Sequence, residues 1–166
     1  ATGSDFTGGT GNIIESYNDL GLNLENVNFI GNHGSVISAS SGSKTFENVE
    51  ISSNTGYAVS VDGSSDFTSV NISGNGGYGL TSSGDKSFVA TIISNNGGHG
   101  ITGSGDMTFN GVVINNNGGH GISGNGSANF TNVTISENSG SALISNGDKV
   151  FDTVTMKGNG GHGVTG

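Results

Sequence analysis

Residues 88–101 read FVATIISNNGGHGI, and residues 109–122, one repeat later, read FNGVVINNNGGHGI. The Phe that opens this unit recurs every 21 residues, with no insertion or deletion between one occurrence and the next. A constant period in this range predicts a solenoid, in which each repeat forms one coil and stacks on its neighbour. The repeated Phe residues are Phe46, Phe67, Phe88, Phe109, Phe130 and Phe151.

Three further positions keep a fixed distance from each Phe: an Asn eight residues later, a Gly ten later and a branched aliphatic residue thirteen later. Coils of a solenoid stack about 4.8 Å apart, so equivalent residues fall into columns. We therefore expect the Phe rings to form an internal stack, and the Asn amides to hydrogen-bond to their equivalents above and below. The Asn column is Asn54, Asn75, Asn96, Asn117, Asn138 and Asn159.

Each unit is expected to contain three short strands and three turns. Aliphatic residues three and five after the Phe, as at Val133 and Ile135, flank an unconstrained position, which is typical of a strand with one face inward. A second recurrent Gly, seventeen residues after the Phe, indicates a turn that requires positive φ. The members of that column are Gly63, Gly84, Gly105, Gly126 and Gly147.

The domain organisation predicted from these columns is one solenoid preceded by a short atypical segment. Residues 1–20 lack the repeat and are interpreted as a capping or docking segment, because the terminal units of solenoids are usually irregular. Residues 21–166 are assigned to the β-solenoid, with strictly 21-residue repeats from Phe46. The sequence stops sixteen residues into a repeat, so we expect either a fragment or ends that join other coils.

Composition excludes several classes of protein. The 33 Gly residues disfavour helices, and the absence of Pro excludes collagen. There is no Cys, so neither disulfides nor thiolate metal sites are available. A net charge of −9 with no Arg makes nucleic acid and anionic membranes poor partners, and no apolar run is long enough to insert in a membrane.

The segment from Ile114 to Ile122 resembles the V-x-I-x-x-N-x-G-x-G-I pattern of the parallel β-helix repeat, found in the right-handed, pectate-lyase-like β-solenoid superfamily. The resemblance covers about residues 22–166 and implies an all-β, single-domain right-handed parallel β-helix. It says little about activity, because that superfamily includes lyases, hydrolases, epimerases, adhesins and passive scaffolds. The leucine-rich repeat L-x-x-L-x-L-x-x-N also fits Phe46 to Asn54, but it requires a large aliphatic residue where every unit here has Gly.

Two columns contain residues that can bind metals. His99 and His120 stand one coil apart and can share a transition metal, or can form a surface ladder beside a Gly turn. Asp85 and Asp106 also lie one coil apart and can hold Ca²⁺, or can serve as ordinary turn residues. The structural interpretation is favoured in both cases, because a good metal site needs three or four ligands, so no cofactor is expected.

Catalysis is not expected. The carboxylates are spread over different columns, there is no Arg to bind a uronate, and the repeats are too uniform to carry inserted catalytic loops. A polysaccharide lyase, hydrolase or epimerase remains the enzymatic alternative. Ice binding is disfavoured because the best Thr column is only half Thr.

The leading hypothesis is a non-catalytic, extracellular or cell-surface structural protein. It would belong to a fibre, filament or adhesin stalk that assembles by end-to-end stacking of solenoids, with residues 1–20 engaging a neighbour. The alternative is a carbohydrate-binding module, or a remnant of a polysaccharide-active β-helix protein, that uses Tyr57 and Tyr78 as a platform for sugar rings.

Overall fold

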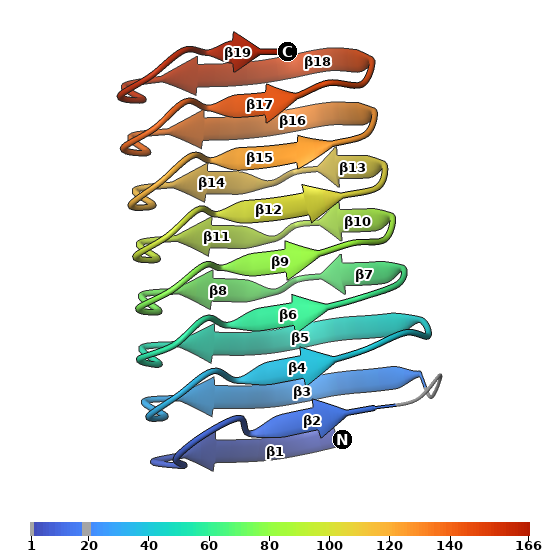
Figure 1. Ribbon diagram of the computed structural model, residues 1–166, viewed down its shortest axis with the longest axis vertical. Helices are drawn as coiled ribbons and strands as arrows, with labels where there is room; N and C mark the ends of the chain where they lie inside the picture. The colour runs from blue at the N-terminus through green and yellow to red at the C-terminus, as the bar shows by residue number, and fades with distance from the viewer. Residues whose placement is uncertain (1, 18–20) are drawn as a thin grey trace.

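The protein is a stack of β-strand coils in the computed structural model, which describes residues 2–17 and 21–166 (Figure 1). Every element assigned among those residues is a strand. The strands form two parallel sheets, one of eleven strands and one of eight. Each coil contributes one strand to the eight-stranded sheet, so the chain makes eight coils.

The larger sheet contains the strand that opens each coil and, in three of the coils, a second strand that follows it. Its strands are β1 (Thr2–Thr7), β3 (Leu22–Ile30), β5 (Lys44–Ser52), β7 (Ser65–Thr68), β8 (Asn71–Ser73), β10 (Lys86–Val89), β11 (Ile92–Ser94), β13 (Met107–Asn110), β14 (Val113–Asn115), β16 (Ala128–Ser136) and β18 (Lys149–Lys157).

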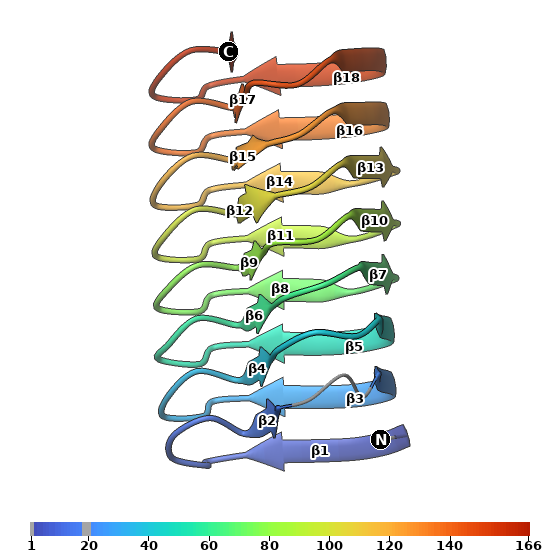
Figure 2. The same ribbon diagram turned by 45° about the vertical axis from the view of Figure 1, so that its right-hand side comes forward.

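The smaller sheet closes each coil on the opposite side. Its strands are β2 (Ile14–Ser16), β4 (Ile37–Ala39), β6 (Val59–Val61), β9 (Leu80–Ser82), β12 (Ile101–Ser104), β15 (Ile122–Asn125), β17 (Leu143–Ser145) and β19 (Val164–Thr165). Figure 2 shows the turns that connect the larger sheet to the smaller one, aligned along one edge of the stack.

The register places equivalent residues over one another. Phe46 pairs with Phe67, and Phe88 pairs with both Phe67 and Phe109, each 21 residues apart. Neighbouring rings from Phe46 to Phe151 are stacked, with centroids 4.6 to 5.2 Å apart. This spacing equals the separation of strands in a sheet, so the 21-residue period is the length of one coil.

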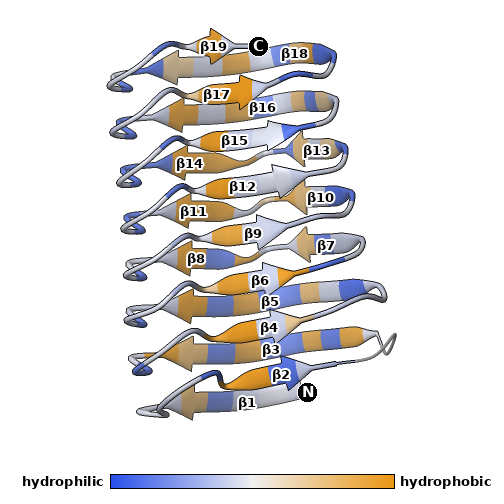
Figure 3. Ribbon diagram, viewed as in Figure 1, coloured by the Kyte–Doolittle hydropathy of each residue, from blue (hydrophilic) through white to orange (hydrophobic). Residues whose placement is uncertain are grey.

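The interior is apolar and continuous from coil to coil. The Phe column and the aliphatic columns join in one buried cluster, to which Val27, Val59 and Ile122 also belong. Hydropathy alternates along the long strands β3, β5 and β16, as the bands in Figure 3 show. Thr91, which replaces an aliphatic residue, is fully buried, and its hydroxyl donates to the carbonyl oxygens of Val89 and Phe67.

The predicted three strands per coil are found in only part of the stack. In the coils of β3, β5, β16 and β18, the first two strands merge into a single nine-residue strand. The bend between them is nevertheless present there, because the residue two after the Phe position has positive φ whether or not the strand is interrupted. Examples are Asn48 (φ 52°) within β5 and Ser69 (φ 55°) between β7 and β8.

The described part of the segment 1–20 does not stand apart from the solenoid. β1 pairs in parallel with β3, and β2 pairs in parallel with β4, so Thr2–Tyr17 supplies the first coil. The ring of Phe6 stacks on Phe29 at 5.0 Å and continues the interior. Pairing therefore begins before the boundary predicted at residue 21, while residues 18–20 lie outside the described residues.

The requirement for Gly at the position seventeen residues after each Phe comes more from close packing of the turns than from positive φ. Gly63, Gly105 and Gly126 have positive φ, as predicted, but Gly84 and Gly147 do not. A Cβ atom on Gly84 would lie 2.2 Å from the carbonyl carbon of Gly63, and on Gly147 it would lie 2.3 Å from that of Gly126. The turns of successive coils thus approach too closely for any side chain.

Candidate functional site

The Asn ladder is the most extensive polar arrangement in the interior. The Oδ1 atom of Asn96 accepts hydrogen bonds from the backbone N–H and the side-chain amide of Asn75, at 3.1 and 2.9 Å. The Nδ2 atom of Asn96 donates to the carbonyl oxygen of Ile72 and to Oδ1 of Asn117. The same pattern runs from Asn54 to Asn159, which confirms the predicted ladder. Its role is structural, since the amides bond to one another and to backbone groups.

A second column, eleven residues after each Phe, forms a ladder of rings along the adjoining turn. The ring of Tyr78 stacks on His99 at 5.3 Å, and His99 stacks on His120 at 4.9 Å. The Nδ1 atom of His99 accepts a hydrogen bond from the backbone N–H of His120, and Nδ1 of His120 accepts one from that of Ser141, both at 2.8 Å. Each imidazole therefore bonds to the next coil. Burial, followed by the charge of His120, lowers the pKa of His99 below its usual 6.5.

These hydrogen bonds argue against a metal held by His99 and His120. An Nδ1 atom that accepts a backbone N–H cannot carry a proton, so each neutral ring has its proton on Nε2. A metal at Nε2 would displace that proton to Nδ1 and break the bond to the next coil. Among the described residues, no group of three or more His, Cys, Asp or Glu side chains could hold a metal ion.

One face of the predicted glycan platform is covered by the ring ladder. Tyr78 is 42% exposed, but its ring lies parallel to His99, with an interplanar angle of 9°. Within the described residues, Tyr57 and Tyr78 do not form a ring stack with each other. Sugars pack on ring faces, and His99 covers one face of the Tyr78 ring. The geometry therefore disfavours Tyr57 and Tyr78 as a sugar platform.

Asp85 and Asp106 stabilise the turn on the opposite edge of the coils. One carboxylate oxygen of Asp85 accepts the backbone N–H of Asp106 at 2.9 Å, and one of Asp106 accepts that of Ser127 at 2.8 Å. The sequence indicated ordinary turn residues, and in the structure each Asp bonds the following coil. These contacts form a turn ladder on two exposed residues.

Sequence reasoning missed the buried lysines of the same turn. Lys44 is 1% exposed, and its Nζ atom donates to the carbonyl oxygens of Ser41, Gly42 and Asp62. Lys86 similarly donates to Gly84 and Ser104. The signal was present in the sequence, because both lysines stand two residues before a Phe, and that position faces inward. Burial lowers the pKa of each lysine, while a nearby Asp acts in the opposite direction.

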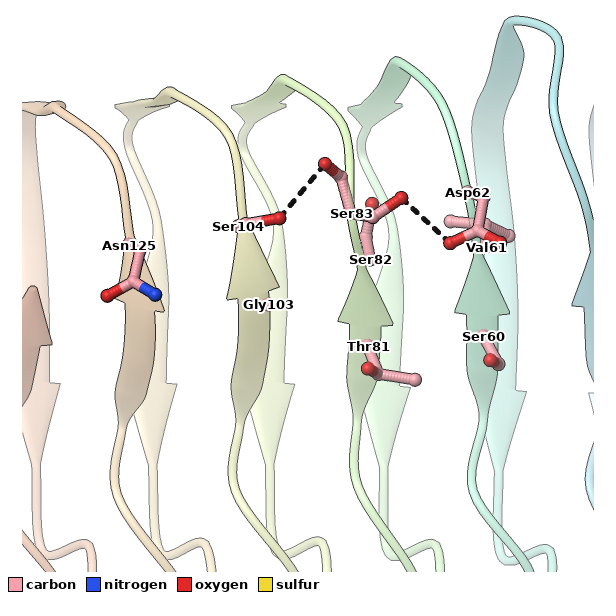
Figure 4. A pocket seen from close by; sticks show the side chains of 9 residues that line it. All are labelled: Ser60, Val61, Asp62, Thr81, Ser82, Ser83, Gly103, Ser104 and Asn125. Carbon is pink, nitrogen blue, oxygen red and sulfur yellow. Dashed lines mark hydrogen bonds between the residues drawn. The ribbon is translucent and has the colours of Figure 1, made fainter.

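The outer face of the smaller sheet carries a shallow hollow of about 260 Å³ over β6, β9 and β12 (Figure 4). Hydroxyl groups line it, together with Asp62 and Asn125. The Asp62 carboxylate accepts the hydroxyl of Ser83 at 2.7 Å, and the Ser104 hydroxyl donates to the Ser83 carbonyl oxygen at 3.1 Å. Among the residues that line the hollow, Asp62 carries the one ionisable side chain.

The coil of β18 and β19 presents an apolar end. Phe151 is 44% exposed and Val164 is 44% exposed, and with Val154 and Met156 they line a depression. In every other coil of the Phe column, the equivalent ring is at most 2% exposed. Phe151 thus belongs to a column that is buried in the preceding coils.

The described part of the chain contains no helix long and apolar enough to cross a membrane. No curated protein and no solved structure matches the chain. The family described as right handed beta helix region matches residues 12–160, which includes both ladders and all but the outermost strands. With its parallel sheets, 21-residue coils and Asn ladder, the chain belongs to the right-handed β-helix family.

Proposed function

We propose that this protein is a non-catalytic structural rod, a segment of a surface fibre or adhesin stalk outside the cell. The observation that carries the proposal is the use of the polar side chains. The Asn and His columns, Asp85, Asp106 and the buried lysines all bond to the next coil or to a turn. Polar groups that would converge on a substrate in an enzyme here hold one coil on another.

The proposal includes stacking of one copy on another through the terminal coils. The strands of both sheets are parallel, so the edge presented by β18 runs in the same direction as the edge presented by β1. Phe6 stands in the same column as Met156, and a copy added head to tail would place the Phe6 ring over the Met156 thioether. A head-to-tail contact does not close on itself, and it therefore generates a filament.

The joint is expected to be weaker than a contact between neighbouring coils within the chain. The first coil has Gly9 at the ladder position, where its backbone N–H donates to Oδ1 of Asn32. Asn159 would therefore find no side-chain amide across the joint. Stacking should accordingly be reversible and should depend on protein concentration.

Replacement of Phe151 by Asp is expected to abolish this stacking, because it places a charge in the apolar end. Val150→Asp is the matched control. Successive side chains of a strand point to opposite faces, so Val150, which is 60% exposed, points away from the inner column that the adjacent Phe151 joins. Sedimentation velocity over a range of concentrations, with electron microscopy, measures the assembly.

Wild-type protein and Val150→Asp should form particles that lengthen with concentration, while Phe151→Asp should stay a single short rod. A wild-type chain that stays monomeric at high concentration would remove the stacking, although a rigid rod would remain. Loss of assembly in both variants would point to lateral association instead.

A further inference from the structure

Seven asparagines are followed directly by glycine. They are Asn75, Asn96, Asn110, Asn117, Asn125, Asn146 and Asn159. Because glycine has no side chain, its backbone nitrogen can approach the Cγ atom of the preceding Asn with the least obstruction. We propose that Asn125 and Asn146 are sites of spontaneous deamidation, and that the fold protects the same dipeptide elsewhere in the chain. This inference does not depend on the proposed function.

The reaction needs only the chain and water. The backbone nitrogen of the glycine gives up its proton to solvent and attacks Cγ of the asparagine. The new N–Cγ bond closes a five-membered succinimide, the Cγ–Nδ2 bond breaks, and ammonia leaves. Water then opens the ring at one of its two carbonyls, which yields aspartate or isoaspartate without any change of oxidation state. A glycine N–H that is held in a hydrogen bond is a poor nucleophile, because that bond must break first.

Backbone hydrogen bonds divide the seven sites into two groups. In five of them the glycine N–H donates to a carbonyl oxygen of a neighbouring coil, at 2.8 to 3.0 Å: Gly76 to Asn54, Gly97 to Asn75, Gly111 to Thr131, Gly118 to Asn96 and Gly160 to Asn138. The N–H groups of Gly126 and Gly147 make no such bond to any described residue. Asn125 and Asn146 are also exposed, whereas Asn75, Asn96 and Asn117 are buried.

Asn125 has a second feature that favours attack. Its Oδ1 atom accepts a hydrogen bond from Nδ2 of Asn146 at 2.9 Å. Negative charge develops on this oxygen when the glycine nitrogen adds to Cγ, and a donor already in place stabilises that charge. Figure 4 shows the Asn125 side chain standing on the outer face of β15, beside the hollow. Asn125 should therefore react before Asn146, whose own Oδ1 accepts no hydrogen bond from the described residues.

Isoaspartate would have a local consequence for the stack. It adds one carbon to the backbone in the turn between β15 and β16, where a Cβ on Gly126 would already lie 2.3 Å from the Gly105 carbonyl oxygen. Because the turns of neighbouring coils are already in close contact, a longer backbone in this turn would displace the turn from its neighbour. Chemical ageing would therefore start at this edge of the solenoid, next to the coil of β16 and β17.

The test is peptide mapping by mass spectrometry of the folded chain, incubated in mildly alkaline buffer, with isoaspartate detected by its separate elution. Asn125 should convert first and Asn146 second, each faster than Asn96 and Asn117 by more than about tenfold, because several hydrogen bonds must open at the ladder sites. In denaturant all seven sites should react at similar rates. Conversion of folded Asn96 or Asn110 as fast as Asn125 would overturn the proposal.

Two variants sharpen the experiment. Asn125→Gln should remove the first product, because a longer side chain does not close a five-membered ring, and it should leave the Asn146 site reactive. Asn146→Ala removes the donor to Oδ1 and should slow Asn125 severalfold, with folding checked by circular dichroism. An unchanged Asn125 rate in Asn146→Ala would reject the activating hydrogen bond, while the protection of the ladder sites would be judged separately from the wild-type map.

Discussion

Replacement of Asn96 by Leu is expected to lower the free energy of unfolding by about 3–9 kcal/mol, because three buried groups each lose a hydrogen-bond partner at roughly 1–3 kcal/mol. These groups are the backbone N–H and the side-chain amide of Asn75, which donate to Oδ1 of Asn96, and the carbonyl oxygen of Ile72, which accepts from Nδ2. Leu keeps the branching of the Asn side chain at Cγ, but its methyl groups are bulkier, so crowding in this buried column adds to the loss of hydrogen bonds. Denaturant unfolding followed by circular dichroism measures it.

Asn110→Leu is the control for this substitution. Asn110 is exposed, lies in β13 and makes no side-chain hydrogen bond to the described residues. A surface change of this kind is expected to alter stability by less than about 0.5 kcal/mol. If Asn96→Leu costs no more than Asn110→Leu, the ladder contributes little to stability, and the apolar columns alone hold the coils together.

Asn96→Asp tests the same ladder through its pH dependence. A carboxylate can still accept from Asn75, but it cannot donate to Asn117 Oδ1 or to Ile72. Two effects raise the pKa of the introduced carboxyl: burial disfavours the charged form, and only the protonated form can donate a hydrogen bond. A raised folded pKa gives stability that is present in acid and lost as pH rises through it. The variant should therefore gain stability on acidification relative to wild type, and a loss would contradict the donor role of Nδ2.

The sequence alone was sufficient to predict the ladders, because a strict period fixes which residues lie over one another. In the central coils each Phe lies over a Phe and each Asn over an Asn, so the contacts of Phe88 and Asn96 follow from the register. The bends were harder to locate. Positive φ falls two residues after the Phe, at Ser69 or Ala90, and seven after it, at Ser53 or Asn95. These positions carry Asn, Ser, Ala, Thr, Glu and Gly in different coils, so no single residue type marks them.

Side-chain direction at the turns could not be predicted from the period. A column eleven residues after the Phe can point outward as a platform or lie along the stack, and only the backbone geometry decides. A Cβ on Gly119 would lie 2.3 Å from Nδ1 of His99, so the imidazole occupies the space that the glycine leaves open. The lysines were misjudged for a related reason: a charged residue is assigned to the surface by default, whereas turn carbonyls can satisfy an ammonium inside.

The histidine column predicts that acid lowers the free energy of unfolding of the solenoid. Protonation of His99 puts a donor at Nδ1, facing the backbone N–H of His120, in a ring whose centroid lies 4.9 Å from that of the His120 ring. Tyr78 covers one end of this pair, and the next titratable group of the column is His162, beyond Ser141. No carboxylate is hydrogen-bonded to either ring within the described residues.

The sign follows from the pKa of His99, which burial and His120 lower below 6.5. In that window the unfolded chain binds more protons than the folded one, so stability present above pH 6.5 is lost as pH falls through the folded pKa. Loss of the hydrogen bond that Nδ1 of His99 accepts should cost about 0.5–1.5 kcal/mol. Thermal and denaturant unfolding across this pH range measure the loss.

The double variant His99→Asn with His120→Asn separates titration from packing. The Oδ1 atom of Asn can replace Nδ1 as acceptor for the N–H groups of His120 and Ser141, and it does not titrate near neutrality. The double variant should therefore keep its stability as pH falls, apart from the contribution of the other groups. His33→Asn, on an exposed residue outside this ladder, should retain the full acid loss. If the double variant loses as much stability in acid as wild type does, the titrating groups lie elsewhere, and the imidazole ladder holds its coils together equally well in both charge states.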